Sequence, residues 1–399
     1  MTIPVAKRIM EIPSSPTLTL NNKAKEMAAA GINVINFGVG EPDFNTPNYI
    51  KEAAKTALEE NFTRYTANAG IPELRQAICE KFSKDNNLLY HSDDILVSPG
   101  AKASIVFILM ALLEPGDQVL LPVPYWVSYP SQVALAGGIP VYVQTSESNS
   151  FKITAKQIET AFQEHKKLRL LILNSPNNPT GAVYSQSELE LIAETCLKHK
   201  IHVLSDEIYE KLVYDGTEFI SIANISDTMK ANTVIVNGVS KSYAMTGWRL
   251  GFSAGPTNVI KAAGKIQEHL CSNVNSITQK AALAAYTLED GSVEKMRREF
   301  EKRKHFLLSA FSDIPHCTCS DAKGAFYLVP NIGWYLKNNQ KSINNSNQLS
   351  LYLLENFRIA CVSGDSFGMD SIIRFSYANS MDNIIEGVKR FKEGLKSLV

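Results

Sequence analysis

Lys241 and Asp206 each follow an apolar run in the middle of the chain, which is an unusual place for a charge. Lys241 comes shortly after TVIVNG, and Asp206 follows IHVLS, with Tyr209 three residues further on. An unpaired buried ammonium or carboxylate is costly, so each needs a partner or a ligand. A lysine in a poorly solvated pocket loses its proton readily, and the neutral amine can form a Schiff base with a carbonyl. Taken singly, a lysine is more commonly a surface residue, and the aspartate could equally be half of a structural ion pair.

Two turns near these runs carry further polar groups. The segment PGAKAS opens an apolar helix, so the backbone N–H groups of Gly100, Ala101 and Lys102 would form an anion site at its N-terminus. The segment PNNPTG predicts a rigid turn that directs the amide of Asn178 toward the strand ends. Each segment alone is compatible with an ordinary turn. Together, an anion site, an acid, a phenol, an amide and a reactive amine match what proteins use to hold pyridoxal phosphate.

These residues must be brought together by the elements that carry them. Between residues 93 and 255, short apolar runs alternate with helical patterns, and runs that are apolar throughout are typical of strands covered on both faces. We therefore predict a mostly parallel, doubly wound α/β sheet, in which ligands bind beyond the carboxyl ends of the strands. One helix is predicted within 184–200, where Ser185 and Glu188 form a capping box and the apolar face consists of Leu189, Ile192, Ala193 and Cys196.

The chain outside this block has a different pattern. Residues 290–310 predict a long charged helix, and the runs GAFYLVP, FRIACVS and SIIRFSYA predict strands among polar loops, which indicates a smaller α+β unit. With 399 residues the chain is also longer than one core usually supports. We expect a large cofactor-binding domain at 46–290 and a small domain made of 1–45 and 291–399.

Composition argues against several classes of function. Forty basic and forty acidic residues cancel, so nothing favours nucleic acid or an anionic membrane as partner, and no stretch reaches the length of a membrane span. Six scattered cysteines lack paired CxxC spacing, so no metal site is predicted and reduced thiols are expected. The N-terminal residues lack the continuous apolar region of a signal peptide. We expect a cytoplasmic protein that acts on small molecules.

Seven motifs resemble those of one enzyme family. They are, in chain order, GEPDF, YTANAGIPELR, PYWVSYP, NSPNNPTG, SDEIYE, SKSYAMTGWRLG and RFSYA, and the match extends from about Thr17 to Arg374. The sequence is similar to the fold-type I, class I aminotransferases, which depend on pyridoxal phosphate, and within them to the bacterial aspartate aminotransferases. The resemblance implies a large domain with a seven-stranded, mostly parallel sheet, a smaller α+β domain, and a homodimer whose active sites are shared between subunits.

The resemblance also implies a role for each matching residue. Lys241 would form the Schiff base with the cofactor, Asp206 would pair with the ring nitrogen, and Tyr209 and Asn178 would bind the ring oxygen. Arg374 would bind the substrate α-carboxylate through both guanidinium nitrogens. The remaining implied groups are Trp126 on the ring face; Gly100, Ala101, Lys102, Ser240, Arg249 and, from a second subunit, Tyr65 at the phosphate; and Gly40, Asn178 and Trp126 beside the substrate.

Two positions bear on affinity and substrate choice. Related enzymes often have serine three residues before the reactive lysine, where this chain has Gly238, so one hydroxyl for the phosphate is expected to be missing. The segment KIQEHLCSNVNSITQK contains no arginine for a distal carboxylate, and the resemblance implies that Lys102 takes this task with help from Thr17. We therefore expect aspartate and glutamate as amino donors and oxaloacetate and 2-oxoglutarate as their oxo acids, in a ping-pong reaction.

Other classes match the sequence less well. The segment INVINFGVGEPD has the Gly38-x-Gly40 of a nicotinamide-binding turn, but Asp43 stands at the third glycine and Pro42 suits that turn poorly. GDSFG at 364–368 matches a serine-hydrolase elbow, but a strand-like run follows it and the last histidine is His316. A DNA-binding regulator would need a helix-turn-helix domain ahead of residue 40. Within the family, a transaminase for prephenate, for aromatic or for other amino acids and a β-lyase stay open.

Overall fold

A seven-stranded sheet forms the centre of the molecule. The computed structural model describes residues 3, 5–10 and 16–399, without the side chains of residues 7–8 and 16–21. The strand order is β2-β8-β7-β6-β5-β3-β4, and neighbours run parallel except that β8 is antiparallel to both β2 and β7. The sheet is thus mostly parallel, as predicted. Its strands are β2 (Ile95–Ser98), β3 (Gln118–Val123), β4 (Ile139–Gln144), β5 (Leu168–Asn174), β6 (His202–Asp206), β7 (Thr233–Gly238) and β8 (Gly251–Ala254).

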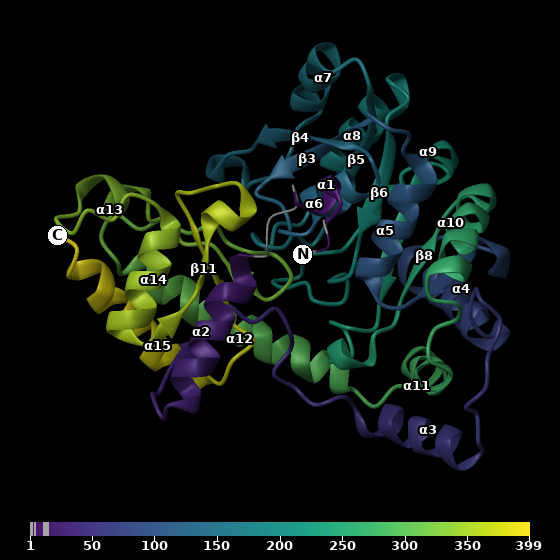
Figure 1. Ribbon diagram of the computed structural model, residues 1–399, viewed down its shortest axis with the longest axis horizontal. Coiled ribbons are helices and arrows are strands. Elements are labelled where there is room, and N and C mark those ends of the chain that lie inside the picture. Colours follow the sequence, from purple (N-terminus) through teal and green to yellow (C-terminus); the bar gives the residue numbers. More distant parts are fainter. Residues whose placement is uncertain (1–2, 4, 11–15) are drawn as a thin grey trace.

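Helices cover both faces of this sheet, which explains why its strands are apolar along most of their length (Figure 1). Leu121 and Leu204 belong to the core on one face, which also includes residues of α5 (Ala101–Leu112), α6 (Tyr129–Leu135) and α10 (Thr257–Leu270). Leu120 and Val203 belong to the core on the other face, under α7 (Ala155–Glu164) and α8 (Gln186–Lys198). A third core cluster joins β2, β7 and β8 to α3 (Asn48–Glu59), α4 (Pro72–Asn86) and α11 (Ser276–Thr287).

The helix predicted within 184–200 is α8, and local interactions set its start. Ser185 is the N-cap: its hydroxyl accepts a bond from the Glu188 N–H at 3.4 Å, while the Glu188 carboxylate accepts one from the Ser185 N–H at 2.8 Å. This reciprocal pair satisfies two N–H groups that a helix start otherwise leaves open. The four apolar residues predicted on one face are all buried. Capping box and apolar face are therefore both confirmed.

A second group of elements lies beside the sheet and is built from both ends of the chain (Figure 1). Strands β11 (Val362–Ser363), β12 (Ile373–Ser376) and β9 (Tyr327–Leu328) form an antiparallel sheet, and β1 (Ile35–Asn36) pairs in parallel with β10 (Ile359–Ala360). Their core includes the buried rings of Phe37, Phe300 and Phe375. The helices here are α2 (Pro16–Ala29), α12 (Ser292–Ser312), which is the helix predicted at 290–310, α13 (Gly333–Asn338), α14 (Ser346–Phe357) and α15 (Met381–Lys396), whereas α1 (Lys7–Met10) is drawn apart from them, in front of the large sheet in this view.

The C-terminal strands are shorter than the apolar runs that predict them. GAFYLVP contributes only two residues to a ladder, and FRIACVS is divided between β10 and β11, which belong to different sheets. Cys361 lies between these two strands and is fully buried. An apolar run therefore reports burial in this part of the chain, and it overstates the length of the hydrogen-bonded strand.

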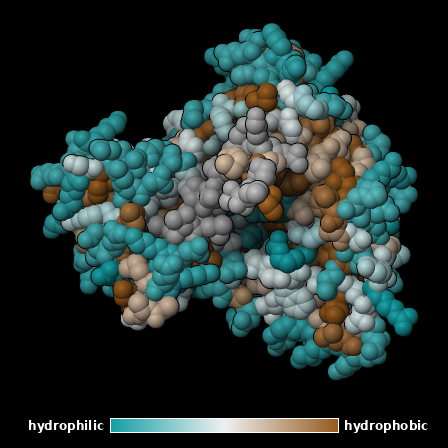
Figure 2. Space-filling model, in the orientation of Figure 1, coloured by the Kyte–Doolittle hydropathy of each residue, from teal (hydrophilic) through white to brown (hydrophobic). Residues whose placement is uncertain are grey.

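Most of the surface shown in Figure 2 is polar, with apolar side chains gathered on the side that carries α3, α10 and α11 in Figure 1. Leu58 in α3, Leu270 in α10 and Leu288 just after α11 are each more than half exposed. Within the ranges that the structure describes, no helix is both long and apolar enough to cross a membrane.

Strand register brings three loops to one place. Asn174 at the end of β5 is paired with Asp206 at the end of β6, and Asp206 is paired in turn with Val236 near the end of β7. Since these strands are parallel, the loops that follow them leave from the same edge of the sheet. The segment after β1 and Arg374 in β12 approach this edge from the second group of elements.

Candidate active site

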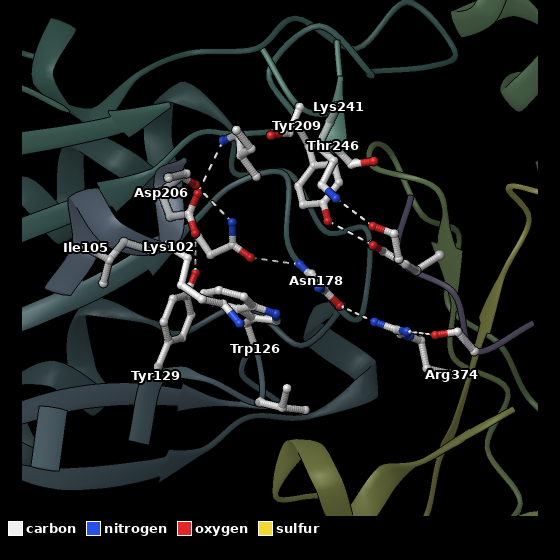
Figure 3. A pocket seen from close by; sticks show the side chains of 18 of the residues that line it. Lys102, Ile105, Trp126, Tyr129, Asn178, Asp206, Tyr209, Lys241, Thr246 and Arg374 are labelled. Atoms are coloured by element: carbon white, nitrogen blue, oxygen red, sulfur yellow. Dashed lines mark hydrogen bonds between the residues drawn. The ribbon is translucent and has the colours of Figure 1, made fainter. Parts of the chain in front are cut away.

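A cavity of about 340 Å³ lies at this edge, between the seven-stranded sheet and the second group of elements (Figure 3). Asp206 and Arg374 enter from opposite sides, and Lys241 comes from the loop after β7. Most residues predicted from the sequence line this cavity: Gly40, Ala101, Lys102, Trp126, Asn178, Asp206, Tyr209, Ser240, Lys241, Arg249 and Arg374.

Three of the residues predicted for the site are not among those that line the cavity. Gly100 lies directly behind it, since a Cβ on Gly100 would come within 2.6 Å of the Arg249 guanidinium. Tyr65 is 91% exposed, so in this chain alone it serves no cavity. Thr17 lies in the first turn of α2, and its side chain is outside the described part of the chain. The roles predicted for Tyr65 and Thr17 stay predictions.

Asp206 is a buried carboxylate held by neutral donors. The Tyr129 hydroxyl donates to its Oδ2 at 2.7 Å and the Ile208 N–H to its Oδ1 at 3.3 Å, while the Asn174 amide donates to its backbone carbonyl at 2.9 Å. Burial raises the pKa of Asp206 to about 6, although the bond from Tyr129 opposes this shift. No cation lies within ion-pair distance among the described residues, so the carboxylate can serve a protonated ring nitrogen.

Lys241 is half-buried, and its amine has one hydrogen-bond partner among the described residues, which is neutral. Its Nζ donates to the Gly40 carbonyl at 2.5 Å and lies 6.0 Å from the centre of the Tyr209 ring. Burial lowers the pKa of Lys241 to about 8; the Glu41 carboxylate raises it in part, and the guanidinium groups of Arg374 and Arg249 lower it further. At this pKa about a tenth of the amine is neutral at pH 7, far more than for an ordinary lysine, and the neutral form is the one that attacks a carbonyl.

The start of α5 forms a cationic cradle. Gly100 adopts the left-handed φ of +90°, and neither the Ala101 nor the Lys102 N–H has a hydrogen-bond partner among the described residues. The Arg249 guanidinium stands against Gly100, and Ser240 is buried on the same cavity wall. Two free N–H groups at a helix start beside a guanidinium and a hydroxyl suit a phosphate. Here the predicted anion site is more than an ordinary turn.

Gly238 requires a different account from the one given by the resemblance. A Cβ at this position would come within 2.8 Å of the Gly251 Cα and 2.9 Å of the Leu250 carbonyl, and Gly238 is not among the cavity-lining residues. A serine here would meet the backbone of β8. The glycine thus allows β7 and β8 to approach each other, and the hydroxyl that was expected to be missing has no room in this chain.

Arg374 is a buried guanidinium without an acidic partner among the described residues. It is 5% exposed; Nη1 donates to the Asn178 side-chain oxygen at 3.0 Å and Nη2 to the Gly38 carbonyl at 2.8 Å, while Nε has no partner. Its centre lies 4.5 Å from the Tyr327 ring. Because a buried cation without a counter-charge is costly, this position calls for an anionic ligand.

Tyr209 and Asn178 have partners other than those predicted from the resemblance. The Tyr209 hydroxyl is 2.9 Å from the Tyr327 hydroxyl, and the side-chain oxygen of Asn178 accepts from Arg374. The Asn178 Nδ2 has no protein partner among the described residues and faces the cavity. Both residues line the cavity, where they could reach a ring oxygen. That role stays a prediction for each of them.

Several lining residues carry interactions that sequence reasoning missed. Tyr129, Asn174, Thr246 and Tyr327 each stand inside a quoted motif or strand run, yet only the fold shows what they contact. The Thr246 hydroxyl donates to the Glu41 carboxylate at 2.8 Å, and the Thr246 carbonyl accepts from Arg249 at 2.9 Å. The only sequence signal for these four residues was that they lie close in the chain to residues already assigned to the site.

The weaker sequence alternatives find no support in the geometry. The Gly38-x-Gly40 turn opens no helix, since α3 begins only at Asn48. The GDSFG segment is a short 3₁₀ turn followed by β12, and Ser366 lies 3.0 Å from the Ser363 hydroxyl. Among the described residues, no three His, Cys, Asp or Glu side chains are placed to hold a metal ion.

The groups at this cavity fit pyridoxal phosphate. A phosphate suits the free N–H groups at the start of α5, a protonated ring nitrogen suits Asp206, and an aldehyde suits the amine of Lys241. Fold and cavity together define the class, a fold-type I enzyme that depends on pyridoxal phosphate.

Comparison with known proteins gives the family. Residues 32–391 match the model of aminotransferase class I and II. The chain is 45% identical over 392 residues to an aspartate aminotransferase of Geobacillus stearothermophilus, covering 98% of this chain and 99% of that protein. A probable aspartate/prephenate aminotransferase of Aquifex aeolicus is 42% identical over 396 residues, 99% of both.

Solved structures agree over the full chain. The aspartate aminotransferase from Rhizobium meliloti matches with a TM-score of 0.95 at 37% identity, covering 100% of both chains. The Thermus thermophilus aspartate aminotransferase with maleate matches with a TM-score of 0.92 at 35% identity, covering 98% of this chain and 100% of that one. This chain belongs to the class I and II aminotransferases, a family of pyridoxal-phosphate enzymes. The predicted family, fold class and cofactor are confirmed.

Proposed function

We propose that this aminotransferase moves an amino group from an acidic L-amino acid, aspartate or glutamate, to a 2-oxo acid, oxaloacetate or 2-oxoglutarate. The observation that carries the proposal is Arg374: a buried guanidinium without an acidic partner among the described residues, across the cavity from an amine of lowered pKa. Arg374 presents its Nη atoms to the α-carboxylate that every substrate of this reaction carries. The amide of Gly40, the amide of Asn178 and the ring of Trp126 complete the substrate side.

The cofactor-holding residues divide by chemistry. The N–H groups of Ala101 and Lys102, the loop glycine Gly100, Ser240 and Arg249 hold the phosphate. Asp206 pairs with the ring nitrogen, Tyr209 and Asn178 bind the ring oxygen, and Trp126 lies on the ring face. Bound pyridoxal phosphate supplies an aldehyde for the amino group and a ring that takes up electrons from Cα.

Two residues manage protons. Asp206 keeps a proton at the ring nitrogen, and its burial among neutral donors leaves it free for that partner. Lys241 Nζ removes the proton from the substrate Cα, because its lowered pKa provides the neutral amine that a base requires. Lys241→Ala should abolish turnover. The test is transfer from aspartate to 2-oxoglutarate, and activity near that of the native chain would sink the assignment.

A distal carboxylate would be recognised by Lys102, with Thr17 assisting. Lys102 lines the cavity with its Nζ 5.0 Å from the centre of the Trp126 ring, and burial together with Arg249 lowers its pKa. Support comes from the names of relatives, aspartate aminotransferases, and from the Thermus thermophilus enzyme, whose structure contains maleate, a dicarboxylate. Lys102→Ala should weaken aspartate and glutamate more than aromatic substrates. Unchanged aspartate kinetics with aromatic substrates that hold or improve would count against this role.

A second candidate substrate is prephenate. The Aquifex aeolicus relative and an aspartate/prephenate aminotransferase of Nitrosomonas europaea, 41% identical over 391 residues, carry that name. A spectral screen separates the candidates: each amino donor and oxo acid is added in turn, and loss or return of the cofactor's visible band marks a substrate. Release of ammonia and pyruvate without a need for 2-oxoglutarate would instead identify a β-lyase.

Assembly, domain division and location belong to this proposal too. A homodimer would bring Tyr65 of a second copy to the phosphate, and the 91% exposure of Tyr65 and the exposed leucines on α3 and α10 support it. Residues 46–290 would form the large domain, with 1–45 and 291–399 as the small one. We place the enzyme in the cytoplasm, without nucleic acid or membrane partners. Sedimentation equilibrium tests the dimer, and Tyr65→Phe tests its phosphate contact.

A further inference from the structure

One acid beside the cavity has no role in the chemistry above. Glu41 is exposed, forms no ion pair with any described residue, and accepts a hydrogen bond from Thr246 at 2.8 Å. It lies in a segment, residues 40–46, that runs along the loop at 241–249. Four hydrogen bonds join the two segments: Lys241 to the Gly40 carbonyl at 2.5 Å, Thr246 to Glu41 at 2.8 Å, Thr46 to the Ala244 carbonyl at 2.7 Å, and the Trp248 indole to the Thr46 hydroxyl at 3.1 Å.

The loop that receives these bonds is strained. Ala244 and Arg249 both have left-handed backbone angles, with φ of +51° and +54°, which residues with a Cβ adopt only when surroundings impose them. Arg249 faces the phosphate cradle, and its guanidinium donates to the Thr246 carbonyl at 2.9 Å. Thr246 therefore connects Glu41 on one side to Arg249 on the other, through its hydroxyl and its carbonyl.

Glu41 also stands among the charges that act on Lys241. The acids near this amine are Glu41 and Asp206, and the cations are Arg374 and Arg249, with the Tyr209 phenol beside them. Glu41 favours the protonated amine more strongly than Asp206 does. Among the acids around Lys241, the exposed one outside the reaction thus has the larger effect.

We propose that Glu41 is a positioning residue of the active site: its bond to Thr246 holds Arg249 toward the phosphate, and its carboxylate acts on the Lys241 amine, which is bonded to the carbonyl of the neighbouring Gly40. This inference rests on the proposed function, because it takes Lys241 as the reactive amine. It adds a residue that contacts neither the reacting atoms nor the cofactor.

The charge is tested in cofactor-free protein. Competitive labelling with acetic anhydride across a pH series, followed by mass spectrometry of the peptide that contains Lys241, gives the pH midpoint of that amine. Glu41→Gln keeps an acceptor for Thr246 and removes the charge, so the midpoint should fall and the neutral amine at pH 7 should rise about threefold. Glu41→Asp retains the charge and should titrate like the native chain. Glu194→Gln, an exposed acid on α8, is the matched control and should leave the midpoint unchanged.

The bond is tested by comparing two ligands. Thr246→Val should weaken pyridoxal phosphate about fivefold and leave pyridoxal, which lacks the phosphate, nearly unchanged, whereas Thr246→Ser should bind both like the native chain. If Thr246→Val loses equal affinity for both ligands, or loses none for either, the bond from Thr246 to Glu41 does not hold Arg249 toward the phosphate. An unchanged Lys241 midpoint in Glu41→Gln overturns the effect of the charge.

A separate measurement keeps this inference distinct from the proposed function. Borohydride reduction of the native holoenzyme, followed by peptide mapping, should find the cofactor attached to Lys241. Absence of that adduct removes the proposed function itself, whereas an adduct together with an unmoved midpoint in Glu41→Gln removes only the role of Glu41. Thermal unfolding of each variant shows that the comparison is made on folded protein.

Discussion

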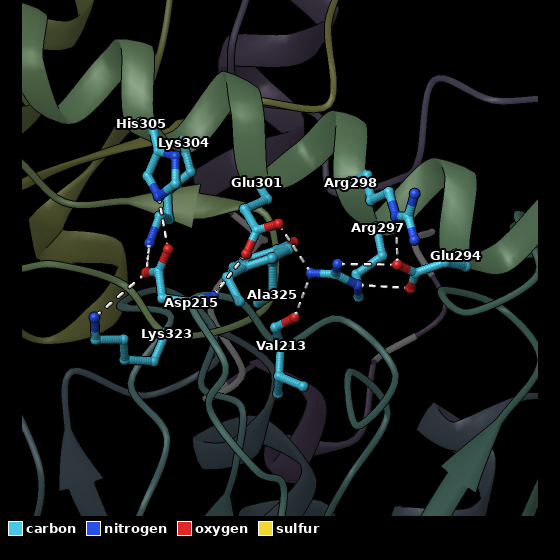
Figure 4. Close-up of polar contacts among 11 residues, drawn as sticks. Val213, Asp215, Glu294, Arg297, Arg298, Glu301, Lys304, His305, Lys323 and Ala325 are labelled. Atoms are coloured by element: carbon cyan, nitrogen blue, oxygen red, sulfur yellow. Dashed lines mark hydrogen bonds and ion pairs between the residues drawn. The ribbon is translucent and has the colours of Figure 1, made fainter.

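Two clusters of charge in this chain are built in opposite ways. Around α12, Asp215 accepts from Lys304, from His305 at 2.6 Å and from Lys323 at 3.3 Å, and Lys304, with no exposed side-chain surface, also reaches Asp321 at 3.0 Å (Figure 4). We call these five residues the α12 charge cluster. In the cavity, Asp206 and Arg374 are buried and Lys241 is half-buried, and none of the three forms an ion pair with any described residue (Figure 3).

The difference separates structural charge from functional charge. In the α12 charge cluster each charged side chain lies beside one of opposite sign. The cluster therefore joins the loop after β6 to the second group of elements without a ligand. In the cavity the partners are carbonyls, amides and phenols, which orient a charge without neutralising it. In the proposed function the ligands supply the missing counter-charges, a protonated ring nitrogen for Asp206 and a carboxylate for Arg374, while the amine of Lys241 reacts with an aldehyde.

Arg374 should show the largest effect on activity. Arg374→Ala leaves the substrate α-carboxylate without its buried partner, at a cost of about 3–5 kcal/mol, so kcat/KM should fall by roughly a hundredfold to several thousandfold. The free energy of unfolding of the cofactor-free chain should change by less than about 1 kcal/mol, because no ion pair is lost. Arg374→Lys, which keeps the charge without the fork, should lie between. A strongly destabilised Arg374→Ala would contradict the comparison.

The pH dependence of stability should have opposite signs in the two clusters. For Asp206 the folded pKa is about 6, above the ordinary 3.8, so its contribution is full below about pH 4 and is lost as pH rises through 6. Each unit of pKa difference between the folded and unfolded states is worth about 1.4 kcal/mol. The difference in unfolding free energy between the native chain and Asp206→Asn should therefore fall by about 2–3 kcal/mol between pH 4 and 7. Urea unfolding of cofactor-free protein measures it, and a flat difference would refute the raised pKa.

Asp215 supplies the opposite slope. Burial alone raises its pKa, but bonds from Lys304 and His305 outweigh burial and hold the pKa of Asp215 well below its ordinary value. Its contribution is present above about pH 4 and is lost as pH falls toward the lowered pKa. The same urea series on Asp215→Asn should therefore show the difference from the native chain shrinking toward low pH. If the two differences changed with pH in the same direction, the distinction between the clusters would be lost.

Lys304→Met should reverse the pattern expected for Arg374→Ala. The substitution removes a buried cation from Asp215 and Asp321 and should lower the free energy of unfolding by about 2 kcal/mol, since Lys323 and His305 still serve Asp215. The value of kcat/KM should stay within about twofold, because no cavity residue is touched. Lys302→Met, an exposed lysine two residues earlier, is the control and should change neither quantity.

Tyr129→Phe should have the smallest effect. It removes one hydrogen bond to Asp206, worth about 1 kcal/mol, so kcat/KM should fall by about fivefold. Because that bond lowers the pKa of Asp206, its loss should move the acidic limb of the pH profile upward. Tyr335→Phe, which removes a buried hydroxyl that donates to the Pro315 carbonyl far along the chain, should leave the profile in place. A profile that does not move would show that Tyr129 only fills space.

Local patterns predicted part of the site. Lys241 and Asp206 were recognisable because a charge after an apolar strand run has few structural explanations, and α8 because its cap and apolar face lie within a few residues of each other. The partners were not recognisable. Tyr129 and Asp206 are 77 residues apart, and Glu41 and Thr246 are 205 residues apart. No periodicity links such positions, since only the packing of separate elements brings them together.

Gly238 and the C-terminal strands show the same limit. The sequence suggested a lost hydroxyl at 238, whereas the contact with Gly251 across the sheet decides that position. Likewise, which residues of FRIACVS enter β10 or β11 depends on the partners β1 and β12, which come from distant parts of the chain. The apolar character of these runs predicted that they are buried, but it did not predict which strands they pair with.

The sequence by itself determined the chemistry available to this protein: an amine, an acid and an anion-binding helix start at the ends of apolar strands, since strand runs and turns are properties of neighbouring residues. Only the tertiary structure decided which charges stay without a counter-charge. That depends on side chains arriving from distant segments, as Arg374 does at Gly38 and Asn178 and as Lys304 does at Asp215. The first arrangement leaves a charge for a ligand, and the second leaves none.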